Sequence, residues 1–263
     1  MRQLLYAAVL LMMSSCSNSE KVLYEELTPA EFTERLEECP VAYLPLGTIE
    51  WHSNHLPLGS DGIQSEEFFK MLAKEAGGIV MPKLFLGPDF DTIITGNEFY
   101  GMDCGRLFSG QCVYDIQQLP GSAYWISDST FGILMDGIMK QLSRAGFKMV
   151  IAHGHGPSTN YIGNHAKEFH ERYNLKVLNC WGNDTADLCL MCDHAAANET
   201  SIMKYFRPEL VKMNSLPGDK SQWPLGMMGE DPRTKASSRL GKDIVFFEIQ
   251  KMKAIIHREL NKQ

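Results

Sequence analysis

Short apolar runs and longer amphipathic stretches alternate along most of the chain. The apolar runs predict buried strands at 41–47, 78–84, 148–154 and 175–181. Apolar residues at helical spacing predict helices at 28–38, 63–78, 128–147 and 159–174, and further helix from about 232 to 260. The first helix has a clear start signal, because Thr28, Pro29 and Glu31 form a capping box with proline at the first helical position.

This alternation predicts an α/β fold with three layers, in which helices cover both faces of a mostly parallel central sheet. The working residues of such sheets lie on loops at the carboxyl ends of the strands. Polar clusters at 50–61, 153–160 and 183–199 follow three of the predicted strands, so we expect them to form one site. Residues 85–126 break the alternation and are rich in glycine and aromatic residues, which is typical of a lid or an assembly surface.

The N-terminus has the features of a targeting segment. Arg2 precedes an apolar run from Leu4 to Met13, which is too short to span a bilayer, and small residues and Cys16 follow. The ending MSSC resembles a bacterial lipobox, so we expect residues 1–15 to be a lipoprotein signal peptide and Cys16 to carry lipid. This anchor would be the protein's link to a membrane, at a bacterial cell envelope. An ordinary signal peptide with a chance cysteine is the alternative.

Length and charge narrow the class of protein further. The chain has 263 residues, enough for one sizeable α/β domain, which we assign to 25–263 with a tether at 16–24. The formal net charge is −7 and no basic stripe offers itself to phosphates, so we expect no nucleic-acid partner. Cys189 and Cys192 form a C-x-x-C pair, for which a structural or incidental role is favoured over zinc or redox chemistry.

The first polar cluster places acids and histidines at a spacing that suits a metal. Glu50 and His52 are two residues apart, so both side chains point the same way on an extended segment. Asp61 follows near the start of the predicted helix, where its carboxylate either bridges two cations or caps the helix. Taken alone, the Glu50–His52 pair is equally consistent with a solvated polar loop.

The other two clusters add further candidates. A predicted strand runs into His153 and His155, and the glycines beside His155 permit close backbone approach. His155 is the better metal candidate, because a histidine inside a sheet, such as His153, is more often part of the core. His194 and Glu199 lie in a stretch of small residues, which is also consistent with a helix that His194 opens and Asp193 caps.

Together, these clusters resemble the motifs of the creatininase (creatinine amidohydrolase) family. The corresponding segments occur in the family's order over about residues 40–245: E-x-H at 50–52, H-L-P-L-G-S-D at 55–61, a proline–glycine turn at 119–122, G-H-G at 154–156, H-A-A-A-N-E-T-S at 194–201 and G-E-D-P-R at 229–233. The resemblance implies an α/β/α fold, commonly assembled into hexamers, so we expect a homo-oligomer. It also implies two divalent metal ions, usually zinc, manganese or iron.

The resemblance assigns roles to particular residues. Glu50, His52, Asp61 and His155 match metal ligands, with Asp61 bridging two ions; oxygen and imidazole ligands suit these metals. His194 matches a histidine near the reacting carbonyl, where it would hold an oxyanion or protonate the leaving nitrogen. Family members hydrolyse C–N bonds, so the expected partner is a small-molecule amide, cyclic amide or formamide.

Two departures from the family pattern bear on the expected activity. Pro157 stands where creatinine-hydrolysing members have a metal-binding glutamate, so Glu199 becomes the fifth ligand candidate and creatinine is not the expected substrate. Ala197 replaces the glutamate of H-A-G-E and removes another carboxylate. The sequence therefore predicts a metal-dependent amidohydrolase and leaves open whether one ion or two bind. A catalytically reduced envelope binding protein with the same fold is the alternative.

Overall fold

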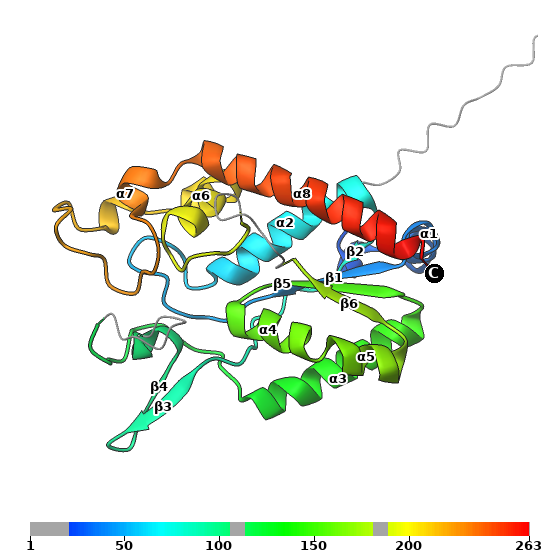
Figure 1. Cartoon of the computed structure of the whole chain (residues 1–263), viewed down its shortest axis with the longest axis horizontal. Coiled ribbons are helices and arrows are strands. Elements are labelled where there is room, and N and C mark those ends of the chain that lie inside the picture. The colour runs from blue at the N-terminus through cyan, green and yellow to red at the C-terminus, as the bar shows by residue number, and fades with distance from the viewer. Residues whose placement is uncertain (1–20, 106–113, 181–188, 263) are drawn as a thin grey trace, which may run out of the picture.

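A parallel sheet forms the centre of the computed structural model, which describes residues 21–105, 114–180 and 189–262 (Figure 1). Its strand order is β2 (Ile79–Val80), β1 (Val41–Leu46), β5 (Met149–Gly154) and β6 (Lys176–Asn179). The register pairs Leu46 with Gly154, so the carboxyl ends of the two central strands meet at one edge. Every residue of β1 and β5 is buried, as expected for apolar strands covered on both faces.

Helices cover both faces of the sheet, which confirms the three-layer α/β/α prediction (Figure 1). One face, which includes Tyr43 and Ile151, packs against α2 (Ser60–Ala76), α6 (Ala197–Phe206) and α8 (Ser238–Leu260). The other face, which includes Leu44 and Val150, packs against α1 (Pro29–Glu38), α3 (Asp128–Ala145), α4 (Gly156–Asn164) and α5 (Ala166–Tyr173). Successive residues of a strand thus pack into different hydrophobic cores, because their side chains alternate between the two faces of the sheet.

Several helix boundaries differ from those predicted. α2 begins at Ser60 instead of residue 63, so Asp61 lies in its first turn, where free N–H groups favour polar residues. Ser127, not Asp128, caps α3, because its Oγ accepts a hydrogen bond from Thr130 N at 3.3 Å. The helix predicted at 159–174 is divided at His165 into α4 and α5. The C-terminal helix is likewise preceded by a separate short one, α7 (Pro232–Lys235).

The segment 85–126, which the sequence leaves without regular structure, contains a β-hairpin. Its strands β3 (Asp91–Ile94) and β4 (Asn97–Tyr100) pair antiparallel and project from the body of the fold (Figure 1). A turn of 3-10 helix, η2 (Gly101–Cys104), follows β4 directly. Three other 3-10 turns are η1 (Tyr24–Glu26), η3 (Pro208–Leu210) and η4 (Met213–Ser215).

The fold begins earlier than the expected domain boundary at residue 25. Val22 is buried in the core, and its carbonyl accepts a hydrogen bond from Val80 N at 2.8 Å. Part of the expected tether therefore packs with the sheet, because its apolar side chain has a place beside β2. The expected signal peptide and Cys16 lie outside the described residues. Among the residues that are described, no helix has both the length and the apolar character needed to cross a membrane.

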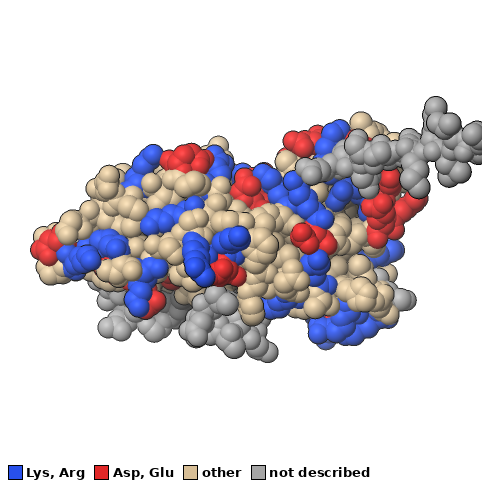
Figure 2. All heavy atoms as spheres, turned by 90° about the horizontal axis from the view of Figure 1, so that it is seen from above, with Lys and Arg blue, Asp and Glu red and all other residues tan. Residues whose placement is uncertain are grey.

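The face that α7 and α8 cover carries charges of both signs. Figure 2 shows lysine and arginine side chains interspersed with aspartate and glutamate across it. On this face the basic side chains do not form a continuous stripe.

Candidate metal centre

The polar clusters meet where β1 and β5 end. His155 N donates a hydrogen bond to the Leu46 carbonyl at 3.2 Å, which ties the first residue after β5 to the end of β1. Gly154 permits this approach, because its φ is +135° and a Cβ atom there would overlap the Leu46 oxygen. Glu50 and His52 lie on the loop that follows β1, which ends at Leu46. The sheet register therefore brings residues about a hundred positions apart in sequence into one buried cluster.

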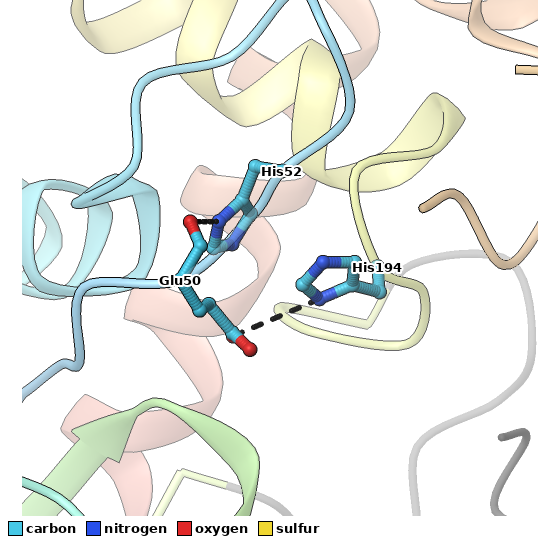
Figure 3. Close-up of side chains that lie close together, drawn as sticks. All are labelled: Glu50, His52 and His194. Atoms are coloured by element: carbon cyan, nitrogen blue, oxygen red, sulfur yellow. Dashed lines mark hydrogen bonds and ion pairs between the residues drawn. The ribbon is translucent and has the colours of Figure 1, made fainter. Parts of the chain in front are cut away.

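His52 faces two carboxylates with one nitrogen and a main-chain carbonyl with the other. Its Nε2 is 3.3 Å from Asp61 Oδ1 and 3.3 Å from Glu199 Oε1. Its Nδ1 is 3.1 Å from the Glu50 carbonyl, a contact drawn in Figure 3. A carbonyl only accepts, so Nδ1 carries the proton and donates it. The other nitrogen, Nε2, points into the cluster and is called the inner nitrogen. It lies between carboxylate oxygens of Asp61 and Glu199, where a cation or a second proton fits.

His155 repeats this arrangement on the other side of Asp61. Its Nδ1 is 3.2 Å from Glu50 Oε1 and 3.2 Å from Asp61 Oδ2. Its Nε2 donates to the Pro88 carbonyl at 3.1 Å. Asp61 therefore directs one carboxylate oxygen to each of the two histidines. Its position in the first turn of α2 makes this possible, since the side chain points from the helix start into the cluster.

His194 lies beside these residues, and hydrogen bonds fix both its main chain and its imidazole ring. Main-chain hydrogen bonds of 2.8 and 2.9 Å join it to Met228, and Nε2 donates to the Trp51 carbonyl at 2.7 Å. Its Nδ1 is 3.8 Å from Glu50 Oε1, and its ring centroid is 4.4 Å from that of His52 (Figure 3). The nitrogen that is not bound to Trp51 therefore faces the Glu50 carboxylate.

Glu199 reaches the cluster from α6. It is fully buried and accepts hydrogen bonds from Gln64 Nε2 at 2.9 Å and Ala195 N at 2.5 Å. The helix begins at Ala197 rather than at His194. The N-cap residue is Ala196 and not Asp193, but the Asp193 carboxylate accepts hydrogen bonds from two first-turn amides, Glu199 N at 3.0 Å and Asn198 N at 2.7 Å. The helix start thus directs Glu199 towards His52.

Opposite charges shift the pKa values in this cluster strongly. Burial lowers the pKa of His52, but Glu199 and Asp61 outweigh it and raise that pKa well above its usual value. Burial also lowers the pKa of His155, and there Glu50 and Asp61 raise it well above normal. Burial raises the pKa of Asp61, but the facing histidines hold it well below its usual range. The carboxylates thus create a field that stabilises positive charge between them and the imidazoles.

Asp89 belongs to the same region, although no motif in the sequence marks it as a site residue. Its Oδ2 is 3.6 Å from His155 Nε2, on the hairpin side of the ring. Burial raises the pKa of Asp89 to about 7, with His155 opposing and Glu50 adding to the shift. An acid directly after Gly87 and Pro88 in an otherwise irregular segment was the available signal. His153, by contrast, lies in the core as expected: its ring packs on Phe68 at 5.7 Å, and burial lowers its pKa to about 3.

The donor atoms form sets that suit a divalent metal. Within each set, atoms of three residues lie within 4.8 Å of one another: Glu50, Asp61 and His155; His52, Asp61 and Glu199; and Glu50, His52 and His194. Carboxylate oxygen and imidazole nitrogen are ligands that zinc, manganese and iron accept. The residues present therefore fit the metal that the sequence implies.

A cleft of about 760 Å³ opens over this cluster, within the usual size of a small-molecule site. Its floor includes Glu50, Asp61 and His155, and Asn160 and Pro157 belong to the α4 wall. Pro157 contributes no ligand atom there. Acids are missing at two positions: Pro157 lies in the cleft wall, and Ala197 lies at the start of α6. The five candidate ligands nevertheless lie together: Glu50, His52, Asp61, His155 and Glu199.

Comparison with protein families decides the relationship. The sequence matches the family described as "Creatininase: Creatinine amidohydrolase" over residues 25–101 and 106–245. The chain belongs to the creatininase family. A comparison with curated proteins finds no match.

Solved structures of the creatininase family share the fold of this chain. "Creatininase Mn" has a TM-score of 0.68 and 21% identity, covering 91% of this chain and 98% of its own. A mutant creatininase of "Zn-Zn type" has a TM-score of 0.69 and 22% identity, with coverage of 91% and 98%. A protein from Bacteroides fragilis NCTC 9343 assigned as a creatinine amidohydrolase has a TM-score of 0.61 and 19% identity, with coverage of 90% and 95%. At these identities the likeness establishes the fold.

Proposed function

We propose that the protein is a metal-dependent hydrolase that breaks a C–N bond in a small amide, cyclic amide or formamide. The observation that carries the proposal is the division of the Asp61 carboxylate between His52 and His155. Each imidazole donates its outer N–H to a main-chain carbonyl, which leaves the inner nitrogen free to bind a metal. One ion would be held by Glu50, Asp61 and His155, and the other by His52, Asp61 and Glu199.

Bound divalent ions supply acidified water and polarise a carbonyl oxygen, which is the chemistry that amide hydrolysis requires. The chain itself contributes proton transfer. Hydrolysis forms a C–O bond with the oxygen of water and breaks the C–N bond, and the leaving nitrogen must gain a proton. Trp51 fixes the Nε2 proton of His194, so Nδ1 is the atom that exchanges a proton with the substrate. We assign His194 this role because Nδ1 faces Glu50 and the ring lines the cleft.

The proposed substrate is an amide other than creatinine. Pro157 occupies the cleft wall where creatinine-hydrolysing members have a metal-binding glutamate. In this chain Glu199 directs a carboxylate to His52 instead. The proposal also includes a homo-oligomer held at the bacterial cell envelope by lipid on Cys16.

Metal analysis combined with a substrate panel tests the proposal. The protein is purified without chelator, its zinc, manganese and iron are measured, and cyclic amides, formamides and short peptides are screened for hydrolysis. We expect two ions per chain, and loss of both metal and turnover in Asp61→Ala. Asp103→Asn is the matched control, because Asp103 is equally buried but accepts its hydrogen bonds from main-chain amides outside the cluster.

Three results would contradict the proposal. One is wild-type protein without stoichiometric metal. Another is an Asp61→Ala variant that retains substrate binding and turnover. The third is metal-loaded protein that binds an amide and never hydrolyses it, which supports the binding-protein alternative.

A further inference from the structure

The carboxylate of Asp89, which is outside the candidate ligand set, lies beside the outer nitrogen of His155. Asp89 Oδ2 is 3.6 Å from His155 Nε2, whereas Asp61 and Glu50 face the other nitrogen of the ring. The Pro88 carbonyl accepts the Nε2 proton at 3.1 Å, so Nε2–H lies between a main-chain oxygen and a carboxylate. We propose that Asp89 is a positioning residue, which holds the His155 imidazole so that Nδ1 points at the metal and thereby raises metal affinity. This inference rests on the proposed function, because it requires a metal beside His155.

The structure holds Asp89 itself firmly in place. Its Oδ1 accepts a hydrogen bond from Phe90 N at 2.7 Å, and its main-chain carbonyl accepts one from Trp125 Nε1 at 3.3 Å. Gly101, with φ at +55°, passes directly over the carboxylate, and a Cβ atom there would overlap Oδ2. The side chain is only 11% exposed. Asp89 is therefore a fixed part of the site wall and not a solvated surface acid.

Such an arrangement has a defined effect on a metal ligand. A carboxylate beside the outer N–H of an imidazole fixes the tautomer, orients the ring and makes the inner nitrogen a stronger donor. It also adds a negative charge that favours a divalent cation nearby. The family's acids are absent at Pro157 and Ala197. Asp89 returns one carboxylate to this region from the hairpin side of the cleft.

The test compares Asp89→Asn with Asp103→Asn in the full-length protein. Asp103 is buried nearby and accepts hydrogen bonds from Leu119 N at 2.7 Å and Tyr100 N at 3.5 Å, so its variant reports effects on local folding alone. Dissociation constants for zinc and manganese are measured by competition with a chromophoric chelator. We expect one of the two ions to bind about 10–100-fold more weakly to Asp89→Asn, as is typical when such a partner is removed. Asp103→Asn should keep the wild-type constants.

A second measurement begins with the wild-type protein alone. Long-range ¹H–¹⁵N spectra of the zinc-loaded wild-type protein report which nitrogen of His155 carries the proton. The inference requires a proton on Nε2, and Asp89→Asn should move the resonance of that proton. An Nδ1-protonated His155 overturns the inference, as does an Asp89→Asn variant with wild-type affinity for both ions; in either case the proposed function stands. A wild-type protein that binds neither metal overturns both.

Discussion

Replacing Glu199 with glutamine should remove one metal ion and leave the other. Glu199 directs Oε1 to His52 and groups with His52 and Asp61, whereas the other set consists of Glu50, Asp61 and His155. Glutamine has nearly the same shape but only one acceptor oxygen and no charge. Ala195 N donates to Oε2 of Glu199, so the single oxygen of the glutamine would stay with Ala195 N. The NH₂ group would then take the place of Oε1 and present N–H groups to His52 and Gln64. The site at His52 then loses a charged ligand while the neighbouring site keeps all of its own.

The size of the effect follows from linkage between metal binding and folding. A metal held at 100 times its Kd stabilises the folded state by about 2.7 kcal/mol. For a chain of this length each kcal/mol raises the Tm by roughly 2–4 °C. Losing one of two ions should therefore remove about half of the metal-dependent rise in Tm, roughly 5–10 °C. The lost hydrogen bond costs a further 1–3 kcal/mol or so, and this loss is the same with and without metal.

Calorimetry of metal-stripped and metal-loaded protein separates these contributions. The difference between the two Tm values cancels the hydrogen-bond cost and leaves the metal term. Glu50→Gln is the matched variant, since Glu50 belongs to the other site. Each variant should retain one ion per chain by elemental analysis. If Glu199→Gln keeps the full metal-dependent rise and two ions, Glu199 is no ligand and the two-site geometry is wrong.

Three further predictions concern folding and targeting. Gly154→Ala should destabilise the fold by about 3 kcal/mol or more in urea unfolding, because the added Cβ meets the Leu46 carbonyl at a positive φ; Gly137→Ala, in open space on α3, should instead stabilise it by about 0.5–1 kcal/mol. Burial, aided by the charges of His52 and Lys204, lowers the pKa of His55 to about 4, so its neutral form contributes stability above pH 6.5 that is lost as the pH falls towards 4. The full contribution is about 3 kcal/mol, of which about 2 kcal/mol is lost between pH 7.5 and 5. His55→Gln should therefore lose about 2 kcal/mol less stability over that range, and equal losses would contradict the reasoning. In cells fed a labelled fatty acid, Cys16→Ser should abolish incorporation of label, and persistent labelling would refute the expected anchor.

The fold could be predicted from sequence because its strands are nearly continuous apolar runs. β1 and β5 lie within a residue of their predicted bounds, and the rule that sites form at the carboxyl ends of parallel strands brought the polar clusters together. Helix boundaries were less accessible. The helix breaks at His165, whose backbone leaves the helical region at φ −100° and ψ 7°, although the apolar spacing continues across it.

The candidate site was predictable where residue spacing alone determines geometry. Glu50 and His52 flank one residue on an extended segment. The register of β1 with β5 then places His155 beside the loop that carries them. Asp89 was not accessible in this way. Its position depends on how the hairpin folds back and on the close approach of Gly101, both of which are tertiary. Contacts between a loop and a site leave no periodic signal in the sequence.

The missing acids at Pro157 and Ala197 do not leave the centre short of negative charge. The region contains four carboxylates: those of Glu50, Asp61 and Glu199 face the two inner nitrogens, and that of Asp89 lies beside the outer nitrogen of His155. When all four are ionised, their combined charge equals that of two divalent ions, so a dinuclear site here would be electrically balanced without the family's glutamate at 157. Two segments remote from that position, the start of α6 and the loop before β3, supply the compensating charges. The alternative of a single ion would leave a surplus of negative charge in a buried site, which is unfavourable without further protons.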